Sequence, residues 1–251
     1  MRASKWIAIA AGVLVVVVSG GALAAGNYVY TSGTVVPCAI NEDDLANSPE
    51  AFYTPASGNG PFPGDGWEKW VDYDLSAWWL TENNYEAVEI PVSEEVTLSA
   101  WWIEPEVPNG KSVIVTHGIG TSRRDFNALL PSAMLVKNGF QVLLVDTRDT
   151  GESTCTDGRH SAGQEESSDF AAVADWLIDN KGIKPASLGM YGVSGGAVAT
   201  SLLPAKTENV SAFAMEGTIF DFNAAATREV EFQGFPGFLW QLALISAQLF
   251  H

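Results

Sequence analysis

The sequence is poor in basic residues, cysteine and histidine, and each shortage excludes a class of protein. Only 13 Lys and Arg stand against 30 Asp and Glu in 251 residues, so the net charge is -17. Such a surface lacks the basic patch that nucleic acids require and does not favour adsorption to anionic lipid. Two cysteines, Cys38 and Cys155, make no disulfide framework, and neither has a metal-ligand spacing. They are open to one disulfide outside the cytosol or to two free thiols.

Charge is also absent from residues 6–25, an apolar run long enough to cross a bilayer as a helix. Arg2 and Lys5 precede the run, and the next basic residue is Lys69. This asymmetry predicts a single-pass membrane protein with a cytoplasmic N-terminus and an extracytoplasmic body. The alternative is a cleaved signal peptide and a secreted protein, since Ala22 and Ala24 provide a small-x-small cleavage site.

Composition divides the chain into three parts. Residues 1–26 are the expected anchor or signal peptide, and residues 27–85 are a connector rich in Gly, Pro, Ser and Asn. The connector holds tryptophans at 67, 70, 78 and 79, which we expect to pack on the globular body. Residues 86–251 carry the pattern of an α/β core.

That core alternates apolar strand-like runs with helical patterns. The expected strands are AVEIPV and TLSAWWIEP as an antiparallel opening pair, then SVIVTHG, FQVLLVD, SLGMYGV and VSAFAMEG. Continuous apolar runs suit strands that are buried on both faces. Helices between them predict a doubly wound, mostly parallel sheet with right-handed crossovers.

Three helices are expected between these strands. The first lies between Ser122 and Gly139, with Pro131 suited to a first helical turn. The second lies between Glu166 and Gly182, with the glycine as its C-cap. The third begins at Ser194 and is stopped by Pro204. After the sixth strand, residues 235–250 read as an apolar lid or core segment.

The stretch GVSGG, residues 192–196, joins the fifth strand to the third helix. G-x-S-x-G in this context predicts a nucleophile elbow, in which a strained turn presents the serine hydroxyl above the sheet. Gly192 and Gly196 remove Cβ atoms that would clash there, and the N–H of Gly195 is directed at the substrate oxygen. Ser194 is therefore the candidate nucleophile. The alternative is a glycine-rich turn with an uninvolved serine.

A second motif, HGIG at 117–120, ends the third expected strand. Gly118 lets the following backbone approach a carbonyl oxygen, and the N–H of Ile119 would be the second donor of an oxyanion hole. We expect the side chain of His117 to be structural and not to act as the base.

With DTRDTGES at 146–153, these motifs resemble the α/β-hydrolase superfamily, and in particular its peptidase-like and esterase-like branch. The resemblance covers about residues 88–251 and implies an α/β-hydrolase fold. Asp146, Arg148, Gly151 and Ser153 match a D-x-R-x-x-G-x-S loop, for which the resemblance implies a role in loop architecture.

The resemblance also implies an acid and then a histidine after the serine. Asp221, and less favourably Glu216, are candidates for the acid. None of the three histidines fits the expected base: His117 lies in the oxyanion loop, His160 precedes the serine, and His251 is the last residue. We therefore expect the sheet to be incomplete at its C-terminus, with the base beyond His251.

The prediction is a serine hydrolase of esters, thioesters or small amides that needs no metal or organic cofactor. Its partners would be a small acyl substrate and, through the N-terminal helix, a membrane. The alternative hypothesis is a catalytically incomplete binding or scaffold protein at the cell surface. A membrane-embedded lipid enzyme is a third hypothesis, drawn from the apolar segment 235–250.

Overall fold

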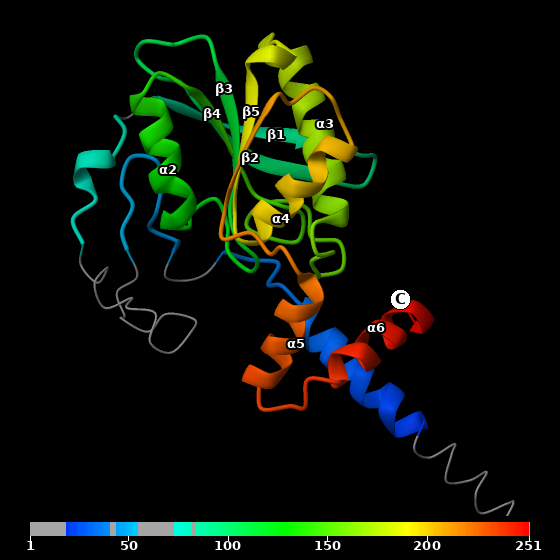
Figure 1. Ribbon diagram of the computed structural model, residues 1–251. Coiled ribbons are helices and arrows are strands. Elements are labelled where there is room, and N and C mark those ends of the chain that lie inside the picture. The colour runs from blue at the N-terminus through cyan, green and yellow to red at the C-terminus, as the bar shows by residue number, and fades with distance from the viewer. Residues whose placement is uncertain (1–18, 41–43, 55–72, 82–83, 251) are drawn as a thin grey trace, which may run out of the picture. The chain divides into compact units, whose positions relative to one another are not determined.

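The computed structural model describes residues 19–40, 44–54, 73–81 and 84–250 (Figure 1). By its internal contacts the chain divides into two units, 36–218 and the described parts of 1–35 with 219–251. Each unit is described below by itself.

The larger unit is built on a mixed six-stranded sheet with the order β1-β2-β4-β3-β5-β6. The strands are β1 Tyr85–Pro91, β2 Thr97–Ile103, β3 Ser112–Thr116, β4 Gln141–Val145, β5 Leu188–Val193 and β6 Ala212–Glu216. β1 and β2 form the expected antiparallel pair, β2 joins β4 antiparallel, and the other four strands run parallel. The expected strand set and the mostly parallel sheet are confirmed.

Three helices cover the two faces of the sheet (Figure 1). α3 Gln164–Lys181 and α4 Gly195–Leu202 lie on one face, where Phe170, Val173 and Leu177 join a buried cluster with β-strand residues. α2 Phe126–Lys137 lies on the other face over a second cluster. The parallel register places the C-terminal ends of β3, β4 and β5 at one edge, and this is where a doubly wound sheet gathers its functional residues.

Two of the expected helix boundaries are corrected. Pro131 lies inside α2 and not in its first turn, because Asp125 caps the helix earlier by accepting a hydrogen bond from the N–H of Asn127 at 2.9 Å. α3 begins at Gln164, two residues before the expected start. Gly182 ends it with a φ of 67°, as a C-cap glycine should.

Residues 27–34 of the connector belong to a helix of the smaller unit, and its described parts from Val36 onward belong to the larger unit. Trp78, in the 3-10 turn Ser76–Trp78, and Trp79 pack against the cluster under α2. The indole N–H of Trp79 donates to the carbonyl of Phe52 at 2.9 Å. This confirms the expected packing for these two tryptophans, while Trp67 and Trp70 lie outside the described residues.

The two cysteines form a disulfide, which settles the alternative that the sequence left open. Cys38 and Cys155 are bonded with a Cα–Cα distance of 5.5 Å across 117 residues of chain. The bond ties the segment after Val36 to the loop between β4 and α3. A second link runs beside it, since the N–H of Val36 donates to the carbonyl of Gly158 at 2.8 Å.

The smaller unit is helical. Residues 19–34 form one helix, and α5 Phe222–Phe232 and α6 Leu239–Phe250 form two more. The predicted membrane span 6–25 lies largely outside the described residues. Among the helices that the structure describes, none combines the length and the apolar character that a membrane span requires.

We predict that the disulfide is a major source of stability for the larger unit. Closing a loop of more than 100 residues restricts the unfolded chain and is worth about 5 kcal/mol in the loop-entropy account. The double substitution C38S/C155S, which leaves no unpaired thiol, should lower the free energy of unfolding by about 2–4 kcal/mol in urea titrations. An unchanged urea midpoint in non-reducing buffer would contradict this expectation.

Candidate active site

The turn between β5 and α4 has the geometry of a nucleophile elbow. Ser194 has φ 51° and ψ -113°, a positive φ that L-residues rarely adopt, and its side chain is exposed. A Cβ at Gly192 would lie 2.4 Å from the carbonyl oxygen of Gly196. A Cβ at Gly196 would lie 2.5 Å from the carbonyl oxygen of His117. Both positions therefore require glycine.

The loop after β3 lies directly against this turn. The N–H of Gly196 donates to the carbonyl of His117 at 3.2 Å. A Cβ at Gly118 would lie 3.3 Å from that of Ser194, and a Cβ at Gly195 would lie 3.1 Å from the backbone nitrogen of Ile119. The amides of Ile119 and Gly195 are thus close neighbours beside the serine. In the described part of the chain, neither amide donates a backbone hydrogen bond.

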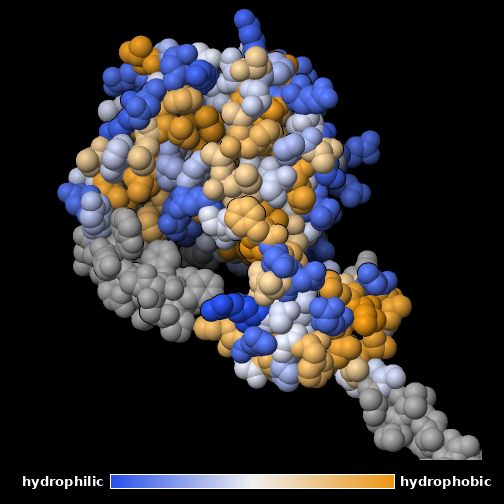
Figure 2. Space-filling view, in the orientation of Figure 1, coloured by the Kyte–Doolittle hydropathy of each residue, from blue (hydrophilic) through white to orange (hydrophobic). Residues whose placement is uncertain are grey.

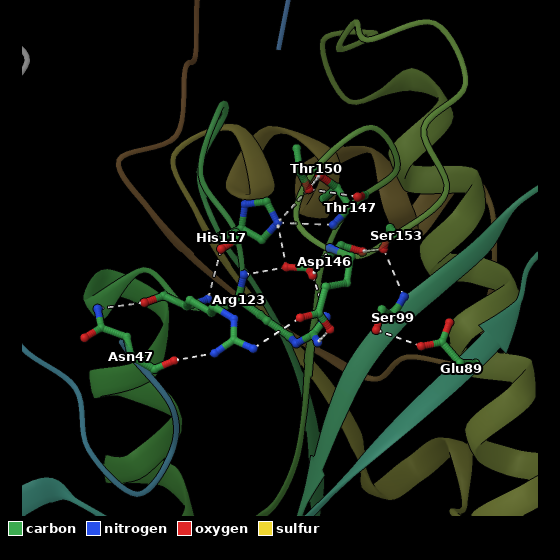
Figure 3. A network of polar contacts seen from close by, with 12 residues as sticks. Asn47, Glu89, Ser99, His117, Arg123, Asp146, Thr147, Thr150 and Ser153 are labelled. Atoms are coloured by element: carbon green, nitrogen blue, oxygen red, sulfur yellow. Dashed lines mark hydrogen bonds and ion pairs between the residues drawn. The ribbon is translucent and has the colours of Figure 1, made fainter. Parts of the chain in front are cut away.

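The ring of His117 is buried and bonded on both nitrogens, and Figure 3 shows the contacts of Nε2. Its Nε2 accepts from the backbone N–H of Thr147 at 3.1 Å and lies 3.2 Å from the hydroxyl of Thr150. Since a backbone N–H can only donate, Nδ1 carries the proton and donates to the carbonyl of Gly118 at 2.8 Å. The ring joins the loop after β3 to the loop after β4.

Asp146, at the end of β4, organises the loop that follows (Figure 3). Its buried carboxylate accepts from the backbone N–H of Arg123 at 2.6 Å, from the guanidinium of Arg123, and from the N–H of Glu152 at 2.9 Å. Gly151 passes so close that a Cβ there would overlap this carboxylate. Ser153 donates to the carbonyl of Asp146 at 2.9 Å. These hydrogen bonds fix the conformation of the loop after β4.

Arg148, the remaining residue of the D-x-R-x-x-G-x-S pattern, points to α3. Its guanidinium makes two hydrogen bonds of 2.7 Å to the carboxylate of Asp169 and one of 2.8 Å to Glu165. The bidentate pair fixes the loop after β4 to the helix that follows it.

Two further residues of this region carried no signal in the sequence analysis. Arg123 is buried, stacks 4.7 Å from the ring centre of Trp101, and pairs with Asp146 and Glu152. Burial opposes ionisation of Glu152, but the charge of Arg123 and the hydrogen bonds from Arg123 and Arg124 hold the pKa of Glu152 below its ordinary value. A hydrophilic SRRD stretch gives no sign that one of its arginines is buried.

Asp149 is the other such residue. It has a φ of 62°, which Asp tolerates better than most residues, and it is buried. Its carboxylate accepts from the hydroxyl of Thr156 at 2.7 Å and from the N–H groups of Asp157 and Gly158 at 3.1 Å. The repeated Asp-Thr in DTRDTG could have suggested a turn, but not a buried carboxylate.

The described candidates for the acid and the base each make hydrogen bonds of their own. His160 accepts from the N–H of Ala162 at 3.3 Å. Asp221 lies in the smaller unit, where it caps α5 by accepting from the N–H of Ala224 at 3.0 Å. The carbonyl of Glu216 accepts from the N–H of Ser194 at 2.7 Å, while its side chain accepts from Tyr191. His251 lies outside the described residues.

Among the described residues, one group has the ligand types of a metal site. Cys38, Asp149 and Cys155 bring their ligand atoms within 4.8 Å of one another. Both sulfurs are joined in the disulfide, and the carboxylate already accepts several hydrogen bonds. As it stands, this group offers no thiolate to a metal.

The sheet, its covering helices and the strand–serine–helix turn define the class: this is an α/β hydrolase. A model of the family described as X-Pro dipeptidyl-peptidase (S15 family) matches residues 65–250. The chain belongs to this family. A comparison with curated proteins gave no significant match.

Solved structures agree with this fold. An esterase of Pyrococcus furiosus, Pf2001, is 27% identical in one crystal form, with a TM-score of 0.52 over 68% of this chain and 63% of that one. In a second crystal form the values are 26% and 0.53, over 70% and 66%. The chain thus spans slightly less than two thirds of the esterase. DcsB, in complex with its substrate analogue, shares the fold at 19% identity, with a TM-score of 0.50 over 60% of this chain and 51% of that one.

The elbow geometry predicts a large loss of stability for one alanine substitution in β5 and a small change for another. In Gly192→Ala the new methyl group would lie 2.3 Å from Thr200 Oγ1 and 2.4 Å from backbone oxygen, so we expect a loss of about 1–3 kcal/mol. In Gly189→Ala the nearest atom is 3.4 Å away, an ordinary contact, and we expect a change below about 1 kcal/mol. Urea titrations of both variants measure the difference. Equal losses would contradict the steric account.

Proposed function

We propose that this protein is a serine hydrolase in which Ser194 attacks the carbonyl carbon of an acyl substrate. The observation that carries the proposal is the strained backbone of Ser194, with φ 51°, at the junction of β5 and α4. Strain at a non-glycine residue persists where the surroundings enforce it, and such positions cluster at functional sites. Here the strain lifts an exposed hydroxyl from the C-terminal edge of the sheet.

In the proposed reaction, the N–H groups of Ile119 and Gly195 hold the oxyanion of the tetrahedral intermediate. Support comes from the closeness of the two amides to each other and from the absence of a backbone acceptor for either among the described residues. Gly195 is also the first residue of α4, so the helix N-terminus favours negative charge at this point. An oxyanion donor of this kind is worth about 3–4 kcal/mol of transition-state stabilisation.

The substrate class proposed is an ester, a thioester or a small amide, peptide bonds included. The family description, which names X-Pro dipeptidyl-peptidases, supports the amide, and the similarity to the Pyrococcus furiosus esterase supports the ester. An acyl group would pass to Ser194, the leaving group would depart with a proton, and water would release the acid. This chemistry asks for no metal or organic cofactor.

A general base is required to activate the serine, and the proposal assigns it to no described residue. His117 already uses its Nε2 as an acceptor, and protonation would break that hydrogen bond inside the protein. The second candidate function stays the alternative that the sequence left open, a hydrolase-like binding or scaffold protein that keeps the elbow without the base.

We further propose that the body of the protein lies outside the cytoplasm, anchored by the apolar run 6–25 or secreted after its cleavage. The disulfide between Cys38 and Cys155 supports export, because such bonds persist in oxidising compartments and are rare in the cytosol. The basic residues before the run and the acidic residues after it support the orientation.

A fluorophosphonate probe separates the two candidate functions. We expect the probe to modify the peptide that contains Ser194, as read by mass spectrometry, and Ser194→Ala to abolish the modification. Ser201→Ala is the matched control, since Ser201 is an exposed serine of the same helix whose hydroxyl only bonds the carbonyl of Val198. Absence of modification at Ser194, or equal modification of the Ser194→Ala variant, would overturn the hydrolase proposal and leave the binding protein.

A further inference from the structure

The smaller unit combines two stretches of sequence that contain no charged residue. One covers residues 6–41 and includes the helix 19–34, and the other covers residues 232–250 and includes α6. In a chain with 43 charged residues, 13 basic and 30 acidic, these gaps are long. The charges of residues 219–250 are confined to α5 and its cap, at Asp221, Arg228, Glu229 and Glu231.

The two uncharged stretches pack directly on each other. A Cβ at Gly26 would lie 2.3 Å from the carbonyl oxygen of Leu242, so the helix 19–34 and α6 cross with their backbones in contact. Ala243 and Ser246 are fully buried in α6. Tyr28 contacts Phe235 edge-to-face at 6.2 Å. Small residues thus hold α6 against the N-terminal helix, as they do where helices approach closely.

The opposite side of α6 exposes apolar side chains next to Gln241 and Gln248. Ile245 and Leu249 share this face by their helical spacing and are 45% and 62% exposed, and Phe238, in the turn just before the helix, is 65% exposed. Apolar surface over this unit is visible in Figure 2. A helix with apolar residues on nearly all sides belongs in a core or in contact with lipid.

The smaller unit also exposes many aromatic side chains. The exposed ones in the unit are Tyr28, Phe220, Phe222, Phe232, Phe235 and Phe238. Trp240 adds an amphipathic ring, whose N–H donates to Asn223 at 3.1 Å and which packs edge-to-face with Phe222 at 5.7 Å. Rings of this kind gather at the boundary between hydrocarbon and water.

From these observations we infer that α6 is an interfacial helix, whose face formed by Phe238, Ile245 and Leu249 lies in the headgroup region of the bilayer. The inference rests on the proposed membrane anchor. Gly26 follows the apolar run 6–25 by one residue, a rise of about 1.5 Å along a helix. Because α6 contacts the backbone at Gly26, a bilayer that holds the run must also meet α6. With 12 residues, α6 is too short to span and suits a position in the plane.

The distribution of charged residues in the smaller unit agrees with a lipid bilayer as the partner of this face. The outer face of α6 has no acidic or basic group to offer to a protein partner, and only Gln241 and Gln248 flank it. α5 carries the charges that would remain in water. Binding would depend on apolar burial and not on anionic lipid, which the net charge of -17 disfavours.

The test uses the full chain in phosphatidylcholine vesicles, with an environment-sensitive bimane label on a single introduced cysteine. Both natural cysteines are bonded to each other, so the variants L249C, Q248C and K184C each offer one free thiol. Leu249 is on the proposed lipid face, Gln248 is its exposed neighbour on the side of α6, and Lys184 is exposed on the larger unit. Vesicle flotation reports the anchor, while quenching by lipid-borne nitroxide and by aqueous iodide reports α6.

We expect the label in L249C to be quenched by lipid nitroxide about three-fold or more above K184C, with Q248C between them. Iodide should quench in the reverse order. If the chain floats but L249C behaves like K184C, the interfacial helix is wrong and the anchor stands. If the label is shielded from both quenchers, protein covers the face, as with a second copy, and the inference is overturned. If the chain does not float, both the anchor and the helix are wrong.

Discussion

The arrangement of the site depends on the close contact of two backbones at the C-terminal edge of the sheet. The first turn of α4 passes so near the end of β3 that Gly196 bonds the carbonyl of His117 and leaves no room for a Cβ. This contact forces the positive φ of Ser194 and brings the amides of Ile119 and Gly195 together. The exposed position of the Ser194 hydroxyl and the pairing of the two amides both follow from this close contact between backbones.

Much of the fold could be predicted because its central strands, β2 to β5, are short, apolar and largely buried. The expected runs at 112–118, 140–146 and 187–193 contain β3, β4 and β5, and the turn Ser93–Glu95 joins the antiparallel pair. The residues at which helices begin were harder to predict from the sequence. Pro131 indicates a helix start by its own conformation, but the capping side chain of Asp125 lies six residues earlier and begins the helix there. Local propensity yields where a stronger cap precedes it.

The site divides in the same way. The elbow and the loop after β3 could be found from sequence because glycine is needed there for steric reasons, and glycine leaves a visible pattern. The buried charged residues that support these loops could not be found from the sequence. Arg123 and Asp149 are buried only because partners distant in sequence satisfy them: Asp146 and Glu152 for the arginine, and the backbone after Thr154 for the aspartate. Such charges look like surface residues until the fold brings their partners together.

The same buried layer explains why the histidine nearest the serine is a poor candidate for the base. A base must exchange a proton during each turnover, so it needs a free nitrogen and an environment that tolerates the charged ring. His117 has no free nitrogen, because the N–H of Thr147 occupies Nε2 and Nδ1 donates to the carbonyl of Gly118. What it can do is fix the carbonyl of Gly118, and with it the direction of the Ile119 amide. The hydrogen bonds that make this histidine useful for positioning the loop are therefore those that keep it from proton transfer.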